Sequence, residues 1–243
     1  MDIETPIRSL IHFYPGKTSL SFGELEESGN GRRFRLHLNK DGTSWVDGFM
    51  MDPLPTVADF GALWALKPPT RGLIKIMGKE REVPRYQQTY GKGYWFSGME
   101  HPPLPTPPIL QRYLDSINTT AMYSDQTFNE ALLNWYSDGT QYIGQHADSL
   151  TNMNLGPNGE SVIFSMTFQE GSNRRIFRMK PKAKFGKTAE ERKRLGKERV
   201  DIEMPNGLVL VMGGLCQETH THQVPKTKKE GGRRINLTLR SFQ

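Results

Sequence analysis

The most regular pattern along the chain is an alternation of apolar and polar residues close to its C-terminus. In residues 234–240 (RINLTLR), Ile235, Leu237 and Leu239 occupy every second position, as in a strand with one apolar face. From Phe128 onward, apolar runs separated by turn residues make the chain a succession of short strands. Patterns of this kind predict strands at 33–38, 73–76, 162–168 and 207–212.

Two segments follow the helical period of 3.6 residues instead. Between Pro108 and Asn118 the apolar residues fall on one face, and a proline stands in the first turn, where helices tolerate it. A shorter helix is predicted over Val57–Leu66, because Pro68 and Pro69 stop it. The chain has no internal repeat of 20–50 residues, and we expect it to be mainly β with flanking helices (α+β).

Composition narrows the class of protein further. The 24 glycines and 16 prolines suit many short turns, and 12 Phe, 8 Tyr and 4 Trp argue against general disorder. A single cysteine, Cys216, excludes an internal disulfide framework and a four-cysteine zinc site. No apolar run approaches the ~18 residues of a membrane span, and the first ten residues lack the apolar stretch of a signal peptide. We therefore expect a soluble monomer inside the cell, in the nucleus of a eukaryote and otherwise in the cytoplasm.

The positive charge is concentrated in two stretches. The net charge is +6, but residues 171–200 carry twelve Lys and Arg against three Glu, and residues 226–240 carry six against one Glu. A surplus placed in this way favours a polyanionic partner such as nucleic acid. The segment Lys180–Arg199 interrupts the strands, and its part Lys180–Glu191 is turn-prone and is not expected to pack as a core element. A mobile, solvated loop would have the same composition.

Candidate metal ligands occur at two places. His146 and Asp148 are separated by one residue, so on a strand their side chains point the same way, and His220 and His222 form a second such pair. Two histidines and one carboxylate make up the facial triad of non-haem Fe(II) oxygenases, which leaves three coordination positions open. An H-x-D pair alone is a weak signal, because many such pairs are surface residues. These residue types by themselves leave open which later histidine would serve.

The polar face of the C-terminal strand is the third candidate feature. It carries Arg234, Asn236, Thr238 and Arg240. On a sheet that faces solvent, this pattern is ordinary. Inside a barrel, the two guanidinium groups would form a fixed site for carboxylates, which they match with paired hydrogen bonds. Each of these features alone is a weak signal. An H-x-D pair, a distant histidine and this strand, occurring together in that order, are a specific one.

This order of motifs resembles the AlkB family of Fe(II)/2-oxoglutarate-dependent dioxygenases, which dealkylate nucleic acids. The resemblance runs from about Met77 to the C-terminal strand, and it implies a double-stranded β-helix (jelly roll) core within a domain at 71–243. Residues 71–100 would form a nucleotide-recognition lid and 178–203 a basic insertion, while residues 1–70 would be an N-terminal extension that packs on the core. The motifs that carry the resemblance are Val83-Pro84-Arg85, Thr89-Tyr90-Gly91, Tyr94–Gly98, the NxY, DG and IGxHxD elements between 134 and 148, Pro205-Asn206-Gly207, His222–Pro225 and the terminal strand.

The resemblance also implies roles for individual residues. The catalytic, metal-binding set would be His146, Asp148 and His222, with His222 preferred to His220 because of the Val-Pro that follows it. Arg234 would pair with the distal carboxylate of 2-oxoglutarate, and Arg240 would lie near the proximal one. The full cosubstrate set would be Asn134, Tyr136, Arg234, Asn236 and Arg240. The alkylated base, extruded from its helix, would be contacted by Tyr94, Phe96, Arg175 and Met77, the last as an apolar wedge.

The implied reaction consumes 2-oxoglutarate and O₂ at Fe(II). It yields succinate and CO₂ and hydroxylates an N-alkyl carbon, and the hemiaminal then releases an aldehyde. The expected function is direct reversal of 1-methyladenine and 3-methylcytosine damage in DNA. RNA demethylation is an alternative, and so is hydroxylation of a protein or small molecule, which Leu150 favours because family members usually carry an acid there that contacts the base. A nucleic-acid-binding module with an inactive barrel is disfavoured by the complete triad.

Overall fold

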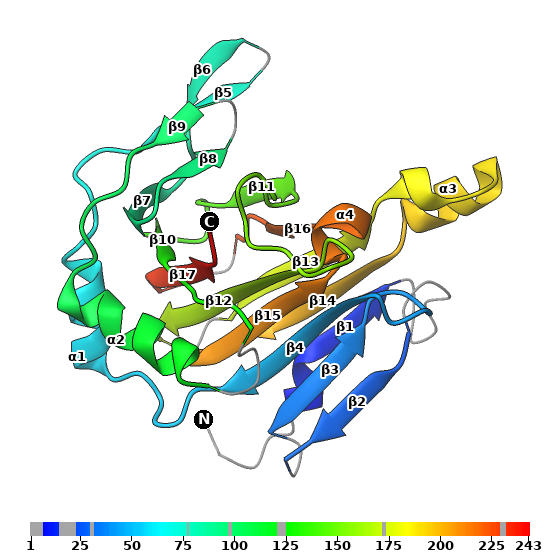
Figure 1. The fold of residues 1–243 in the computed structure, drawn as a ribbon, viewed down its shortest axis with the longest axis horizontal. Coiled ribbons are helices and arrows are strands. Elements are labelled where there is room, and N and C mark those ends of the chain that lie inside the picture. The colour runs from blue at the N-terminus through cyan, green and yellow to red at the C-terminus, as the bar shows by residue number, and fades with distance from the viewer. Residues whose placement is uncertain are drawn as a thin grey trace.

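Two facing antiparallel sheets form the body of the protein in a computed structural model (Figure 1). The structure describes residues 7–14, 23–29, 32–76, 78–96, 99–120, 125–171, 174–228 and 232–243, and only the backbone of 76, 94–96 and 99–101. The larger sheet contains, in spatial order, β2 (Leu25–Ser28), β3 (Arg33–His37), β4 (Ser44–Met50), β15 (Leu208–Gly214), β12 (Ser161–Gln169), β17 (Arg234–Arg240), β10 (Glu130–Tyr136) and β7 (Tyr86–Gly91). The smaller sheet contains β1 (Ile11–Tyr14), β14 (Arg199–Met204), β13 (Arg175–Pro181), β16 (His220–Val224) and β11 (Ile143–His146).

From β10 to β17 the chain passes repeatedly between the two sheets. Strands β10, β12, β15 and β17 lie in the larger sheet, and β11, β13, β14 and β16 lie in the smaller one. All pairings within this set are antiparallel. This is the double-stranded β-helix that the motifs predict, and the prediction of the fold class is confirmed.

Strand β17 separates an outer apolar core from the interior between the sheets. Its apolar residues Ile235, Leu237 and Leu239 belong to a buried cluster with α1 (Val57–Trp64) and α2 (Pro108–Asn118). A second buried cluster fills one end of the space between the sheets. The polar residues of β17 face the space between the sheets. The alternation in the sequence therefore gives the strand one face packed against the helices and one face that lines the cavity. Among the described residues no helix is both long and apolar enough to cross a membrane.

The N-terminal strands pair directly with strands of both sheets. Strand β4 pairs with β15 along its whole length, and β1 pairs with β14. Without these strands β14 and β15 would present open edges, which natural sheets avoid. Phe34 and Leu36 alternate with polar residues in β3 and enter the inner cluster, so the pattern of a half-buried strand is satisfied by the main sheet.

The basic insertion is shorter and more ordered than its composition predicts. Residues 178–181 belong to β13 and 199–203 to β14, so the connection runs over 182–198. It contains a short 3₁₀ helix (Ala183–Phe185) and the helix α3 (Ala189–Leu195). Thr188 and Glu191 form a reciprocal capping box at the start of α3, and the helix formers that follow favour propagation. Neither short helix buries a residue, so they do not pack as core elements.

Two hairpins make up most of the segment predicted as a lid. They are β5–β6 (Leu73–Ile76 and Lys79–Glu82) and β8–β9 (Tyr94–Phe96 and Met99–His101). Figure 1 shows both hairpins beside β7, projecting beyond the sheets near β11, whereas α3 extends from the opposite side of the molecule. The two hairpins form separate two-stranded sheets of their own.

Candidate active site

A cavity of about 670 Å³ opens between the two sheets. It is lined by polar residues of β10 and β17 from the larger sheet and by residues of β11, β16 and the loop after β11 from the smaller one. All eight residues predicted to hold the metal or 2-oxoglutarate line this cavity: Asn134, Tyr136, His146, Asp148, His222, Arg234, Asn236 and Arg240. The structure thus brings together side chains that are up to about a hundred positions apart in the sequence, although the ligand that each one holds stays a prediction.

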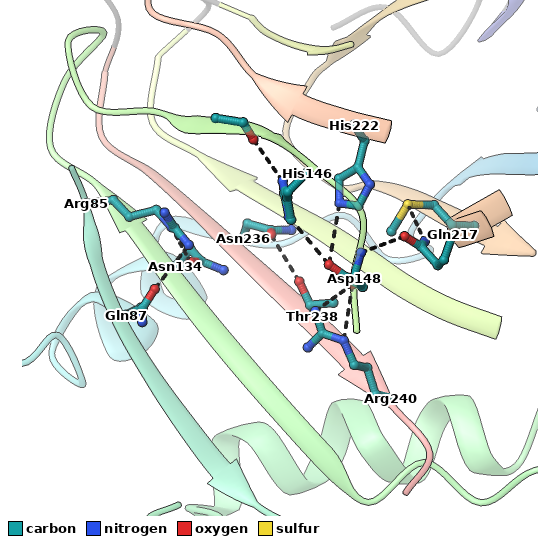
Figure 2. Close-up of polar contacts among 12 residues, drawn as sticks. Arg85, Gln87, Asn134, His146, Asp148, Gln217, His222, Asn236, Thr238 and Arg240 are labelled. Carbon is teal, nitrogen blue, oxygen red and sulfur yellow. Dashed lines mark hydrogen bonds and ion pairs between the residues drawn. The ribbon is translucent and has the colours of Figure 1, made fainter. Parts of the chain in front are cut away.

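His146, Asp148 and His222 form a compact cluster on one side of the cavity. Their possible ligand atoms all lie within 4.8 Å of one another. The Oδ1 atom of Asp148 lies 3.4 Å from Nε2 of His146 and 3.7 Å from Nε2 of His222 (Figure 2). Strand β11 ends at His146, so Asp148 belongs to the following loop and not to the strand on which the sequence pattern placed it.

Both histidines direct Nε2 toward Asp148. His146 Nδ1 lies 2.8 Å from the carbonyl oxygen of Gly144, and since a carbonyl only accepts, Nδ1 carries a proton, which orients the ring with Nε2 toward the cluster. Burial, with a smaller contribution from His146, lowers the pKa of His222 to about 3, so its ring is neutral near pH 7. Phe177 stacks on the His222 ring at 5.4 Å between centroids and restricts its orientation.

A buried ion-pair chain fixes the Asp148 carboxylate. Arg240 donates from Nε and Nη2 to Oδ2 of Asp148, at 3.2 and 2.7 Å, and from Nη1 to Glu130 at 3.1 Å. Burial alone raises the pKa of Asp148, but the Arg240 charge and the contact with His146 outweigh it and hold the pKa well below its ordinary value. Asp148 is therefore ionised, with Oδ2 occupied by Arg240 and Oδ1 directed at the histidines.

The opposite side of the cavity holds a second, differently organised cation. Arg234 is 1% exposed, and its Nη2 donates to Thr167 Oγ1 and Met204 Sδ, both at 3.2 Å. Its Nε and Nη1 have no hydrogen-bond partner in the described part of the chain. Burial lowers the pKa of Arg234 to about 10, which still leaves it protonated near pH 7. A buried cation that lines the cavity with two unused donors is suited to bind an anionic acceptor there.

Two amides line the wall between these groups. Arg85 donates from Nε to Asn134 Oδ1 at 2.6 Å and from Nη2 to Gln87 at 3.1 Å, which leaves the NH₂ group of Asn134 for another acceptor. Asn236 donates from Nδ2 to Ser165 at 2.8 Å and accepts from Thr238 at 3.2 Å, so its amide is already engaged within the protein.

Of the four residues predicted to contact the base, only Arg175 has a side chain that the structure describes. Arg175 does not line the cavity, and its guanidinium donates to the backbone carbonyls of Asp138, Gln141 and Pro225 at 2.8–3.2 Å. These bonds tie the loop after β10 to the end of β16. The backbones of Tyr94 and Phe96 lie in β8, Met77 lies outside the described residues, and their substrate contacts stay predictions.

Two positions that raised questions in the sequence have clear locations. His220 does not line the cavity and lies 2.8 Å through Nδ1 from Thr219, so the structure places His222, not His220, beside Asp148. Leu150 packs against the inner apolar cluster, and its neighbour Ser149 lines the cavity instead.

Several site residues were not predicted. Glu130, Arg85 and Gln217 each contact a predicted site residue through a side chain. A signal for Glu130 existed, because it stands at period two with Asn134 and Tyr136 in the strand run EALLNWY. No local pattern marks Gln217, whose contact with Asp148 spans 69 positions.

The residues present fit both an iron ion and a 2-oxoglutarate dianion. Two imidazoles and one carboxylate are the donor set that non-haem Fe(II) takes, with positions left open. The unused donors of Arg234 suit a carboxylate, which guanidinium binds with two parallel hydrogen bonds. Fold and donor set together define an iron- and 2-oxoglutarate-dependent oxygenase.

Comparison with known proteins agrees with this class. The sequence model of the 2OG-Fe(II) oxygenase superfamily matches residues 75–240, which shows that the chain belongs to that superfamily, and similarity to individual relatives places it in the AlkB family. It is 34% identical over 172 residues to the DNA oxidative demethylase ALKBH2 of Bos taurus, covering 70% of this chain and 57% of that protein. The human ALKBH2 is 32% identical over 172 residues, covering 70% and 60%.

A second group of relatives is similar over nearly the same region. The alpha-ketoglutarate-dependent dioxygenase alkB homolog 3 of Rattus norvegicus is 31% identical over 160 residues, covering 65% of this chain and 50% of that protein. The chain thus matches between half and two thirds of the length of these relatives.

Proposed function

We propose that this protein is an Fe(II)/2-oxoglutarate-dependent dioxygenase that removes N-alkyl groups from bases in DNA. The observation that carries the proposal is the pairing, in one cavity, of the His146, Asp148 and His222 cluster with a buried Arg234 that has two unused donors. DNA is favoured as the substrate because relatives at 30–34% identity are named DNA oxidative demethylases.

Iron, 2-oxoglutarate and O₂ would together supply the oxidation of an N-methyl carbon, with succinate and CO₂ as by-products and formaldehyde released from the hydroxymethylated base. His146, Asp148 and His222 would hold the metal. Arg234 would bind the distal carboxylate of the cosubstrate, and the NH₂ group of Asn134, oriented by Arg85, would donate a further hydrogen bond. Tyr136 is buried beside Arg234, with its ring 5.1 Å from the guanidinium carbon, and helps to exclude water from this end of the cavity.

The base enters from the side of the two hairpins. Ile74, Arg81 and Glu82 of the β5–β6 hairpin, with Val83 and Pro84 after it, line the cavity, which supports a lid over residues 71–100. The base has to leave its helix to reach the interior, and the unpairing costs a few kcal/mol, least for a lesion that pairs poorly. We also infer that the protein acts as a monomer inside the cell.

The test is turnover with defined oligonucleotides. Succinate and formaldehyde are measured with 1-methyladenine or 3-methylcytosine in single-stranded DNA, duplex DNA and RNA of one sequence, and with the unmethylated strands. We expect methylated DNA to give both products in equal amounts. Preference for RNA would identify the alternative substrate. Succinate production unaffected by any oligonucleotide would indicate a protein or small-molecule substrate and contradict the proposal.

The basic insertion is expected to affect affinity and not chemistry. Lys184, Lys187 and Lys193 are exposed, and contacts of this kind with phosphate release counterions, so each lost contact lowers the salt slope of duplex binding by about 0.9. Replacing all three with serine should therefore weaken binding of duplex DNA and reduce the slope by up to about 3. Lys182 is retained, because its Nζ donates to the carbonyl of Gln217 at 2.8 Å.

The measurement is fluorescence anisotropy of a labelled duplex at several salt concentrations. Lys40→Ser, which changes an exposed lysine in the turn between β3 and β4, is the control and should leave the slope unchanged. Uncoupled 2-oxoglutarate consumption should be equal in all variants. Identical affinity and slope after the triple substitution would mean that the insertion is only a spacer.

A further inference from the structure

The loop that carries Asp148 depends on a side chain from another element. The pairing of β11 with β16 ends at His146, so the backbone N–H of Asp148 lies outside the ladder. It donates instead to Oε1 of Gln217, at 2.9 Å, from the short helix α4 (Cys216–Thr219) (Figure 2). A buried backbone N–H that loses its acceptor costs about 1–3 kcal/mol, so this bond is a strong restraint on the loop.

Gln217 is itself held on both sides. It is 3% exposed, and its Nε2 donates to Sδ of Met212 at 3.4 Å, which leaves Oε1 as the atom that faces Asp148. Its own backbone carbonyl accepts from Nζ of Lys182 at 2.8 Å. The side chain therefore has one orientation and cannot exchange its oxygen and nitrogen without losing both contacts.

Asp148 is consequently restrained at two independent points. Arg240 binds Oδ2 of its carboxylate, and Gln217 binds its backbone. The two contacts together determine where Oδ1 lies relative to the Nε2 atoms of His146 and His222. Arg240 alone would fix one oxygen but would leave the loop free to rotate about it.

We infer that Gln217 is a positioning residue for the metal site, acting through the backbone of Asp148 without touching the metal. This inference rests on the proposed iron-binding function. Residues that orient a metal ligand without binding the metal typically change metal affinity by roughly 10–100-fold when they are replaced. The order of the loop in the metal-free protein should change as well, since the bond exists without the ion.

The test compares Gln217→Met with the wild type. Methionine keeps the length and most of the volume of the side chain and removes the amide oxygen. We expect Fe(II) or Co(II) to bind roughly 10–100-fold more weakly, measured by anaerobic titration of the Co(II) absorption bands and by competition with Fe(II). We also expect faster hydrogen exchange at the amide of Asp148 in the metal-free protein.

Gln141→Met is the matched control. Gln141 is also buried, and its Oε1 also accepts a backbone N–H at 2.8 Å, but the donor is Ser137 and not Asp148. The Gln141→Met variant should lower the melting temperature by about as much as Gln217→Met does. It should leave the metal affinity and the hydrogen-exchange rate of the Asp148 amide unchanged. Gln217→Glu keeps an oxygen at the same distance along the side chain and should restore protection of that amide.

The outcomes separate the inference from the proposed function. The inference would be overturned if Gln217→Met bound the metal as tightly as the wild type does. It would also be overturned if Gln217→Met and Gln141→Met lost metal affinity to the same extent. A wild type that binds no Fe(II) would overturn the proposed function. The exchange rate of the Asp148 amide, measured without metal, would still decide whether Gln217 holds this loop.

Discussion

Replacement of Asp148 by asparagine is expected to reduce turnover by more than about 100-fold, because loss of a direct ligand exceeds the effect of an outer contact. The amide keeps an oxygen for Arg240, so the buried guanidinium retains an acceptor there as well as its bond to Glu130. Alanine would leave that part of Arg240 unpaired, and breaking a buried pair in this way costs about 3–5 kcal/mol. Asparagine therefore tests the metal site with less disturbance of the fold.

The measurement is succinate formation with methylated DNA, together with Fe(II) binding and the melting temperature of each variant. His146→Ala should behave like Asp148→Asn. His220→Gln is the control, because His220 lies in the same strand as His222 but does not line the cavity. Loss of activity in His220→Gln together with retention in a His222→Gln variant would show that the ligand assignment is wrong.

Elements with one periodic face could be predicted closely from the sequence. The helix predicted over Pro108–Asn118 has those limits in the structure, and β17 shows the predicted division of faces. Both depend on burial of one side against a large apolar surface, which requires a regular pattern in the residues themselves. The cavity residues of β17 could be found for the same reason, since they occupy the alternate positions.

The features that the sequence pattern did not reveal depend on partners distant in sequence or on local capping. Nothing in the pattern of β4 specifies that its neighbour is β15, more than 150 positions later, so the N-terminal strands could be taken for an extension. Helix α3 has no buried residue and therefore no apolar face to detect, and its signal was the capping box at Thr188. Arg240 forms an ion pair with Glu130, which lies 110 positions away in the sequence.

Replacement of Arg234 by lysine is expected to raise the 2-oxoglutarate requirement strongly. Lysine keeps the charge but presents a compact ammonium instead of a planar fork, and it cannot supply two parallel bonds to a carboxylate. Loss of such a contact with a buried partner costs on the order of 2–5 kcal/mol, which corresponds to roughly 30- to 5000-fold in affinity. Arg234→Met should have a larger effect, because it removes the charge as well.

The experiment measures the 2-oxoglutarate dependence of succinate formation and the binding of 2-oxoglutarate to Mn(II)-loaded protein. Arg233→Lys is the matched control, since the adjacent Arg233 makes its paired bonds with Glu170, both at 2.6 Å, at the exposed surface. Exposed pairs contribute about 0–1 kcal/mol, so this variant should differ little from the wild type. The change in Arg234→Lys should be confined to the cosubstrate, with Fe(II) affinity retained, because Arg234 does not contact the histidines or Asp148. An unchanged 2-oxoglutarate dependence would show that the unused donors of Arg234 serve another anion and that the cosubstrate lies elsewhere in the cavity.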